Sequence, residues 1–93
     1  MMHDLGNVTS AALVGEAKKA LSLYKCGTQQ LLDACYSEAM DSFFKAAAIA
    51  VNVTFTAKTH GTDIPEAICE KMDILVARAT KGIKKVMKAV ATK

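Results

Sequence analysis

The residues able to carry out chemistry are few and scattered along the chain. His3 and His60 are the only imidazoles, and neither has a cysteine or carboxylate at metal-ligand spacing on one helix face. The three cysteines, Cys26, Cys35 and Cys69, are odd in number and form no C-x-x-C pair. We expect them to be buried free thiols, because cysteine packs as a small hydrophobe. Neither a metal site nor a disulfide framework is predicted.

The sequence also shows no familiar arrangement of catalytic residues. Asp33, Glu38 and Asp41 lie close in sequence, but no E-x-x-H motif accompanies them, so a solvated helix face explains them better. The one basic residue directly beside a cysteine is Lys25, which precedes Cys26, and a single neighbouring lysine is weak evidence for a reactive thiol. The glycines occur singly, which excludes a glycine-rich phosphate loop. We therefore predict a protein that is not an enzyme, has no cofactor and works by binding.

Length and composition predict one small domain that spans residues 1–93. Hydrophobic residues make up 52% of the chain and aromatic residues only 5%, so small aliphatic side chains must build the core. The start of the chain shows no charged leader before an apolar run, which argues against a secretory signal. The least polar stretch, 46–53, is far shorter than the roughly 20 residues of a membrane span. We expect a cytoplasmic protein without a transmembrane segment.

Charge is distributed unevenly along the chain. The stretch after Asp73 has a formal charge of +6 and the rest has −3, which together give the net +3. The excess is explained either by favourable interaction of cations with a helix C-terminus or by an anionic partner. The chain has a single arginine and no aromatic residues among these cations, so sequence-specific reading of bases is not indicated. A membrane-surface role would need Trp or Phe in this stretch, which has neither.

Hydrophobic spacing predicts a first helix from about residue 8 to residue 25. Cys26 and Gly27 would end it, and Thr28 would cap the next helix. The residues expected to face the core are Ala11, Val14, Ala17, Leu21 and Tyr24.

The strongest pattern predicts a central helix of about thirty residues, since no Gly or Pro occurs between Gln29 and Gly61. Its C-terminal boundary is the least defined, because the β-branched and aromatic residues of 51–56 would also suit a strand. The seam alternates steps of three and four residues: Leu32, Tyr36, Ala39, Phe43, Ala46, Ala50, Val53 and Ala57.

A last helix is predicted from the capping Asp63, with Pro65 in its first turn and Glu66 three residues after the cap. Its seam is Ile68, Met72, Leu75, Ala79, Gly82, Val86 and Ala89. The fold class is therefore all-α, as a small antiparallel bundle of three helices. The alternative is a long helical hairpin, continuous across Gly27, that completes its core by dimerisation.

These patterns favour a helical protein-interaction module of adaptor, chaperone or inhibitor type, which forms a homo-oligomer or binds another protein through apolar helix faces. The expected apolar contacts are Phe43, Phe44, Val51, Leu75 and Val86. The alternative function is binding of nucleic acid or another polyanion through the basic C-terminal helix, using Lys81, Lys84, Lys85 and Lys88.

Overall fold

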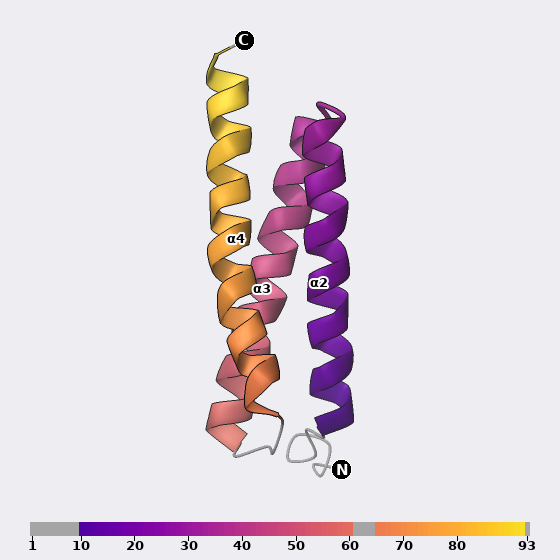
Figure 1. The fold of residues 1–93 in the computed structure, drawn as a ribbon, viewed down its shortest axis with the longest axis vertical. Coiled ribbons are helices and arrows are strands. Elements are labelled where there is room, and N and C mark those ends of the chain that lie inside the picture. Colours follow the sequence, from indigo (N-terminus) through magenta and orange to yellow (C-terminus); the bar gives the residue numbers. More distant parts are fainter. Residues whose placement is uncertain (1–9, 61–64, 93) are drawn as a thin grey trace, which may run out of the picture.

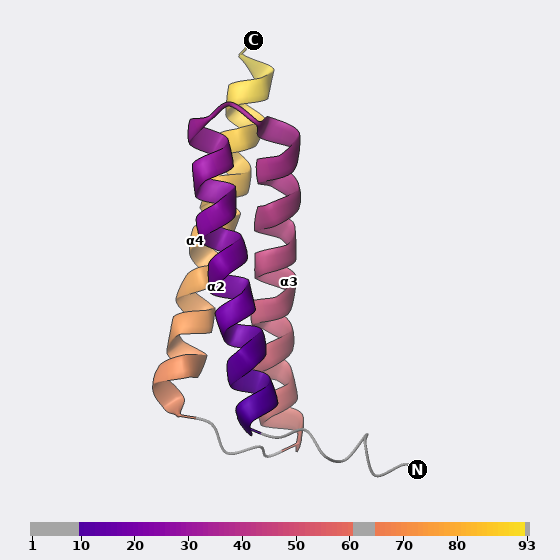
Figure 2. The same ribbon diagram turned by 90° about the vertical axis from the view of Figure 1, so that its right-hand side faces the viewer.

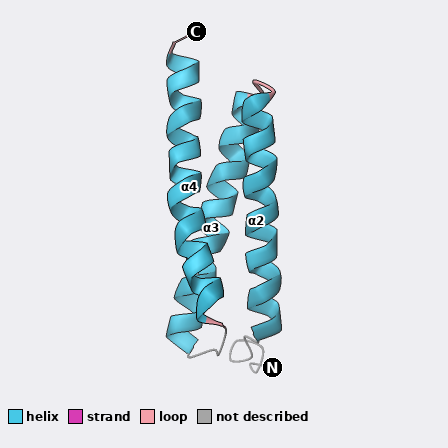
Figure 3. Ribbon diagram, viewed as in Figure 1, coloured by secondary structure: helices cyan, strands magenta, loops and turns pink. Residues whose placement is uncertain are grey.

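The structure, a computed structural model, describes residues 10–60 and 65–92. These residues form α2 (Ser10–Leu32), α3 (Tyr36–His60) and α4 (Glu66–Ala91), and the described ranges contain no strand (Figure 3). α3 runs antiparallel to both other helices (Figure 1). The predicted all-α class and the antiparallel bundle of three helices are thus confirmed. The β-branched run at 51–56, which would also have suited a strand, lies within α3.

The end of the first helix was predicted wrongly. α2 continues through Gly27 to Leu32, and the hydroxyl of Thr28 donates to the carbonyl oxygen of Tyr24 at 3.0 Å instead of capping a new helix. Packing against α3 explains why a glycine occurs inside this helix. A Cβ atom at position 27 would lie 3.0 Å from Cδ1 and Cε1 of Phe43, so any larger residue there would require the ring to shift.

The chain turns between α2 and α3 at residues 33–35, over the short connection visible in Figure 2. The N–H of Cys35 donates to the carbonyl of Gln30 at 2.8 Å, and that of Ala34 donates to the carbonyl of Leu31 at 3.1 Å. This pair of bonds is a Schellman motif, in which the residue at the position of Ala34 is left-handed and usually glycine. Ala34 has φ of 62°. Because alanine occupies the position where glycine is usual, the sequence does not indicate this turn.

The predicted core faces are confirmed on α3 and α4 and are only partly right on α2. On α3 the seam from Ala39 to Ala57 is buried, although Leu32 falls outside the helix and is exposed. On α2 the buried apolar side chains are those of Leu13, Ala17 and Ala20, whereas the predicted Ala11 and Leu21 are exposed. Apolar residues occur around more of α2 than α3 and α4 cover. Their spacing alone therefore does not show which side of α2 faces the core. The buried residues of α4 are Met72, Leu75, Ala79, Gly82 and Val86.

α4 begins two residues later than predicted, because a cap at Asp63 would have made residue 64 the first residue of the helix. Pro65 precedes the helix instead of lying in its first turn, and its carbonyl oxygen accepts the N–H of Ile68 at 2.9 Å. Asp63, the predicted cap, lies outside the described residues. None of the helices as described is both long enough and apolar enough to cross a membrane.

Candidate protein-binding surfaces

One face of the bundle is incompletely covered. α3 packs extensively against both other helices, while α2 and α4 contact each other much less. Figure 1 looks onto this face, with α2 and α4 in front and α3 behind them. Apolar side chains on the facing sides of α2 and α4 are therefore left partly open.

Three adjoining depressions follow this face, with volumes of about 180, 290 and 260 Å³. The first two share Leu21, Lys71 and Met72, and the second and third share Tyr24 and Arg78. They therefore form one continuous depression, here called the α2–α4 groove. Its apolar lining comes from both helices and includes Val14, Leu21, Tyr24, Leu31, Ile68, Met72, Ile74 and Leu75.

Among the residues that the structure describes, every charged residue that lines the α2–α4 groove is a cation. Seven-residue spacing places Lys71, Arg78 and Lys85 on one side of α4, because seven residues make nearly two helical turns. The acidic residues of α4 line none of the three depressions. The complete charged lining is Lys18, Lys71, Arg78, Lys81 and Lys85. The groove thus combines an apolar floor with a cationic rim.

A second apolar surface lies on α3, away from the core. Phe44, Val51 and Phe55 are 56%, 51% and 65% exposed, and Ala48 between them is exposed too. These four residues, here called the outer seam, follow steps of four, three and four along the helix. That is the spacing of a coiled-coil seam. α3 therefore has two seams, one that forms the core and one on the surface.

The residues expected to bind a partner divide between the interior and the surface. Phe43, Leu75 and Val86 are at most 3% exposed, so they belong to the core, although Leu75 also contributes to the apolar lining of the α2–α4 groove. Phe44 and Val51 do lie at the surface, in the outer seam. Core seams are the most regular apolar patterns in a helix, so periodicity indicates residues of the interior more readily than residues of a binding surface. The exposed large apolar residues that the sequence did not indicate as contacts are Leu21, Leu32, Phe55, Ile74, Met87 and Val90.

The four lysines of the predicted polyanion site are all exposed on α4. Lys81 and Lys85 line the α2–α4 groove, whereas Lys84 and Lys88 do not. Lys18 of α2 also lines the groove. It is far from the α4 lysines in sequence, and the fold brings it close to α4.

The cysteines are free, but their predicted burial is wrong for two of them. Cys26 and Cys35 are exposed, and Cys69 is half-buried. Cys26 lies about 100° around the helix from the core-facing Gly27, which directs it to solvent. Cys35 belongs to the turn between α2 and α3. Across residues 10–60 and 65–92, no group of three or more histidine, cysteine or acidic side chains is arranged to hold a metal ion.

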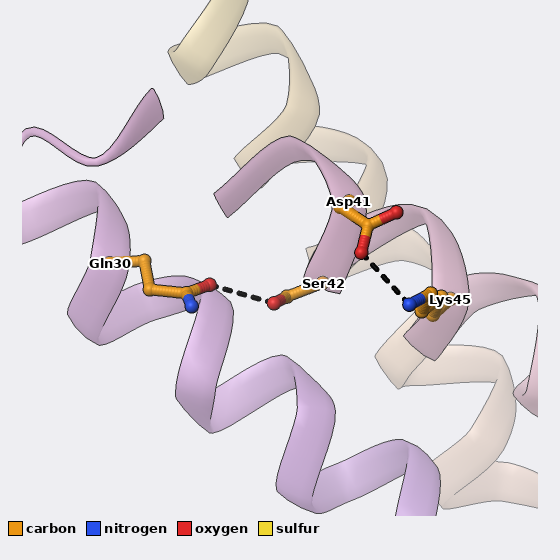
Figure 4. A network of polar contacts seen from close by, with 4 residues as sticks. All are labelled: Gln30, Asp41, Ser42 and Lys45. Atoms are coloured by element: carbon orange, nitrogen blue, oxygen red, sulfur yellow. Dashed lines mark hydrogen bonds and ion pairs between the residues drawn. The ribbon is translucent and has the colours of Figure 1, made fainter. Parts of the chain in front are cut away.

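A side-chain hydrogen bond joins α2 to α3, next to an ion pair within α3 (Figure 4). The buried hydroxyl of Ser42 donates to Oε1 of Gln30 at 2.7 Å, which satisfies the hydroxyl across the helix interface. Lys45 and Asp41 form an ion pair at 3.0 Å one turn apart on α3. Both of these side chains are mostly exposed, so the pair adds little stability.

Comparisons of the chain with protein-family models, with curated proteins and with solved structures found no significant match. The described residues form a three-helix bundle whose open apolar surfaces include the outer seam and the α2–α4 groove.

Proposed function

We propose that this chain is a non-enzymatic protein-interaction module that self-associates through the outer seam of α3. The supporting observation is the row of exposed Phe44, Val51 and Phe55 at coiled-coil spacing. Burial of such side chains against a second copy is favourable by roughly 1.5 to 3 kcal/mol for each residue that becomes fully covered. Ala48 lies between them and allows the backbones of two helices to approach closely.

Chain length supports the same proposal. A domain of this size buries only about 60 to 65% of the surface that its unfolded chain exposes, so it gains stability from association. In a twofold dimer the same patch serves both copies, and one apolar row is sufficient for the interface.

The test is the mass in solution, measured by light scattering after size exclusion over a range of concentrations. We expect the wild-type chain to have at least twice the mass of 9.9 kDa at high concentration. The double variant Phe44→Glu/Phe55→Glu should be monomeric, because two buried charges would face each other in the interface. Asn52→Glu, which adds charge at an exposed position of α3 outside the seam, should leave the mass unchanged. A monomeric wild-type chain at every concentration would refute the proposal.

A second candidate function is binding of a polyanion through Lys81, Lys84, Lys85 and Lys88. The observation that favours it is the exposure of all four lysines, none of which forms an ion pair with a described residue. Salt separates the two candidates. Polyanion affinity falls steeply as ionic strength rises, while association through an apolar seam depends only weakly on it.

The expected cytoplasmic location also belongs to the proposal. Three free cysteines in a small chain suit a reducing compartment, where thiols are not oxidised to disulfides.

A further inference from the structure

We propose that the α2–α4 groove binds one amphipathic helix of a partner protein, with an apolar stripe against the floor of the groove and acidic residues along its edges. The groove and the outer seam lie on different surfaces, so this inference does not require that the chain self-associates.

The apolar floor of the groove favours a helical ligand. Leu21 and Ile74 are 41% and 52% exposed on opposite sides of the groove, and half-buried Val14 and Tyr24 continue the floor along α2. Two neighbouring helices with an open apolar seam between them are the receptor in helix-in-groove recognition. A docked helix would convert the three-helix array into a four-helix bundle.

The length of the groove sets the length of the ligand. The lining runs from Val14 to Leu31 on α2 and from Ile68 to Lys85 on α4. Each of these segments spans seventeen helical steps, or about 26 Å at 1.5 Å per residue. A ligand helix of about 18 residues would therefore cover the groove from end to end.

The rim selects the charge of the ligand. All five charged side chains that line the groove are cations, so a helix with Glu or Asp beside its apolar stripe is complementary on both edges. A basic helix would meet like charge. A nucleic acid would satisfy the cations but would leave Leu21 and Ile74 without apolar partners, and the acidic helix is therefore favoured.

The helix directions suggest the orientation of the ligand. α2 and α4 run parallel, with their N-terminal ends at the same end of the bundle (Figure 1). An antiparallel ligand would place its N-terminal half beside Arg78, Lys81 and Lys85, the more cationic end of the groove. Acidic residues also stabilise the N-terminal turn of a helix, so one set of carboxylates would serve both purposes.

The experiment is a selection from a displayed library of 18-residue helical peptides against the full chain, followed by affinity measurements with the enriched peptides. We expect enriched peptides to carry apolar residues at steps of three and four with acidic residues on both flanks. Binding should weaken at least about tenfold in Arg78→Glu/Lys85→Glu, because attraction at the rim becomes repulsion. Leu21→Glu should weaken it as well, since it places a charge on the apolar floor.

Matched controls locate the binding. Lys19→Glu/Lys58→Glu makes the same change of charge at exposed lysines outside the groove and should keep full affinity. Phe44→Glu/Phe55→Glu should also bind the peptide normally, even where it abolishes self-association. Circular dichroism checks that each variant is folded, and Leu21→Ala replaces Leu21→Glu if the charged variant unfolds.

Three outcomes would overturn the inference. The first is the enrichment of peptides without acidic flanks, and the second is peptide affinity that is unchanged in both groove variants. The third is tight binding of a single-stranded oligonucleotide that is lost in Arg78→Glu/Lys85→Glu, without any enriched amphipathic peptide. Each of these results is independent of the mass measurement that tests self-association.

Discussion

A Cβ atom at Gly82 would lie 2.7 Å from Cζ of Phe43, closer than carbon atoms of a folded protein approach. Gly27 faces Cδ1 and Cε1 of the same ring, where a Cβ atom would be 3.0 Å away. The ring is almost fully buried, and the ring of Tyr24 lies 5.8 Å from it between centroids. Glycines on α2 and α4 therefore make the space for the one large aromatic side chain of the core, which α3 contributes.

Gly82→Ala should destabilise the bundle despite the better helix propensity of alanine. Overpacking of a core typically costs about 1 to 3 kcal/mol, while alanine returns about 1 kcal/mol in a helix interior, so we expect a net loss of about 1 kcal/mol. The measurement is the free energy of unfolding in urea. Gly15→Ala is the matched control: no atom lies within 4 Å of the added Cβ, and this variant should gain about 0.5 to 1 kcal/mol. Equal gains in both variants would contradict the steric explanation.

The smaller side chain of Phe43→Leu should reduce the effect of Gly82→Ala. Leucine lacks the outer ring atoms that the new Cβ would meet, so the double variant should lose less stability than the two single variants added together. We expect a coupling free energy of at least about 0.5 kcal/mol between the two positions. A double-mutant cycle in urea measures it, and strict additivity would mean that the methyl group is accommodated elsewhere.

Ala34→Gly should stabilise the turn between α2 and α3. Ala34 occupies the left-handed region with φ of 62°, where an L side chain costs about 1 kcal/mol and glycine does not. The thermal midpoint should rise in this variant. Ala77→Gly, at an exposed helical position of α4, should instead lose about 1 kcal/mol. A lower midpoint for Ala34→Gly would show that this turn is not left-handed in solution.

Ser42→Ala should cost about 0.5 to 1.5 kcal/mol, because it removes the hydrogen bond to Gln30 across the α2–α3 interface. Lys45→Ala, one turn further along α3, removes only an exposed ion pair and should change stability by less than about 0.5 kcal/mol. Both values come from urea unfolding. If the lysine variant lost more stability than the serine variant, the interhelical bond would not be the important contact.

Much of this fold follows from the sequence because α3 and α4 each have a long core seam. Ala39, Phe43 and Ala46 recur at alternating steps without interruption, and so do Met72, Leu75 and Ala79. Periodicity of this kind determines which side of a helix is buried before any neighbour is known.

The errors occur where the outcome depends on neighbours. Gly27 has the residue type of a helix end, and only the position of the Phe43 ring shows that it is a packing site. Ala34 adopts a glycine conformation without being glycine. On α2, Leu13 and Leu21 are both apolar, and the placement of α3 and α4 decides that the first is buried and the second lines the groove. For the same reason, Lys18 joins the cations of α4 only in three dimensions.

The contact of one phenylalanine with two glycines also limits the order in which this sequence can diverge. A larger residue at position 27 or 82 meets the ring of Phe43 at once, whereas a smaller residue at position 43 makes room for either change. Substitution at position 43 is therefore the permissive first step, and the glycines become free to vary only afterwards. Homologous sequences that retain phenylalanine at this position should retain both glycines, and those that have lost it should show alanine or serine at one or both.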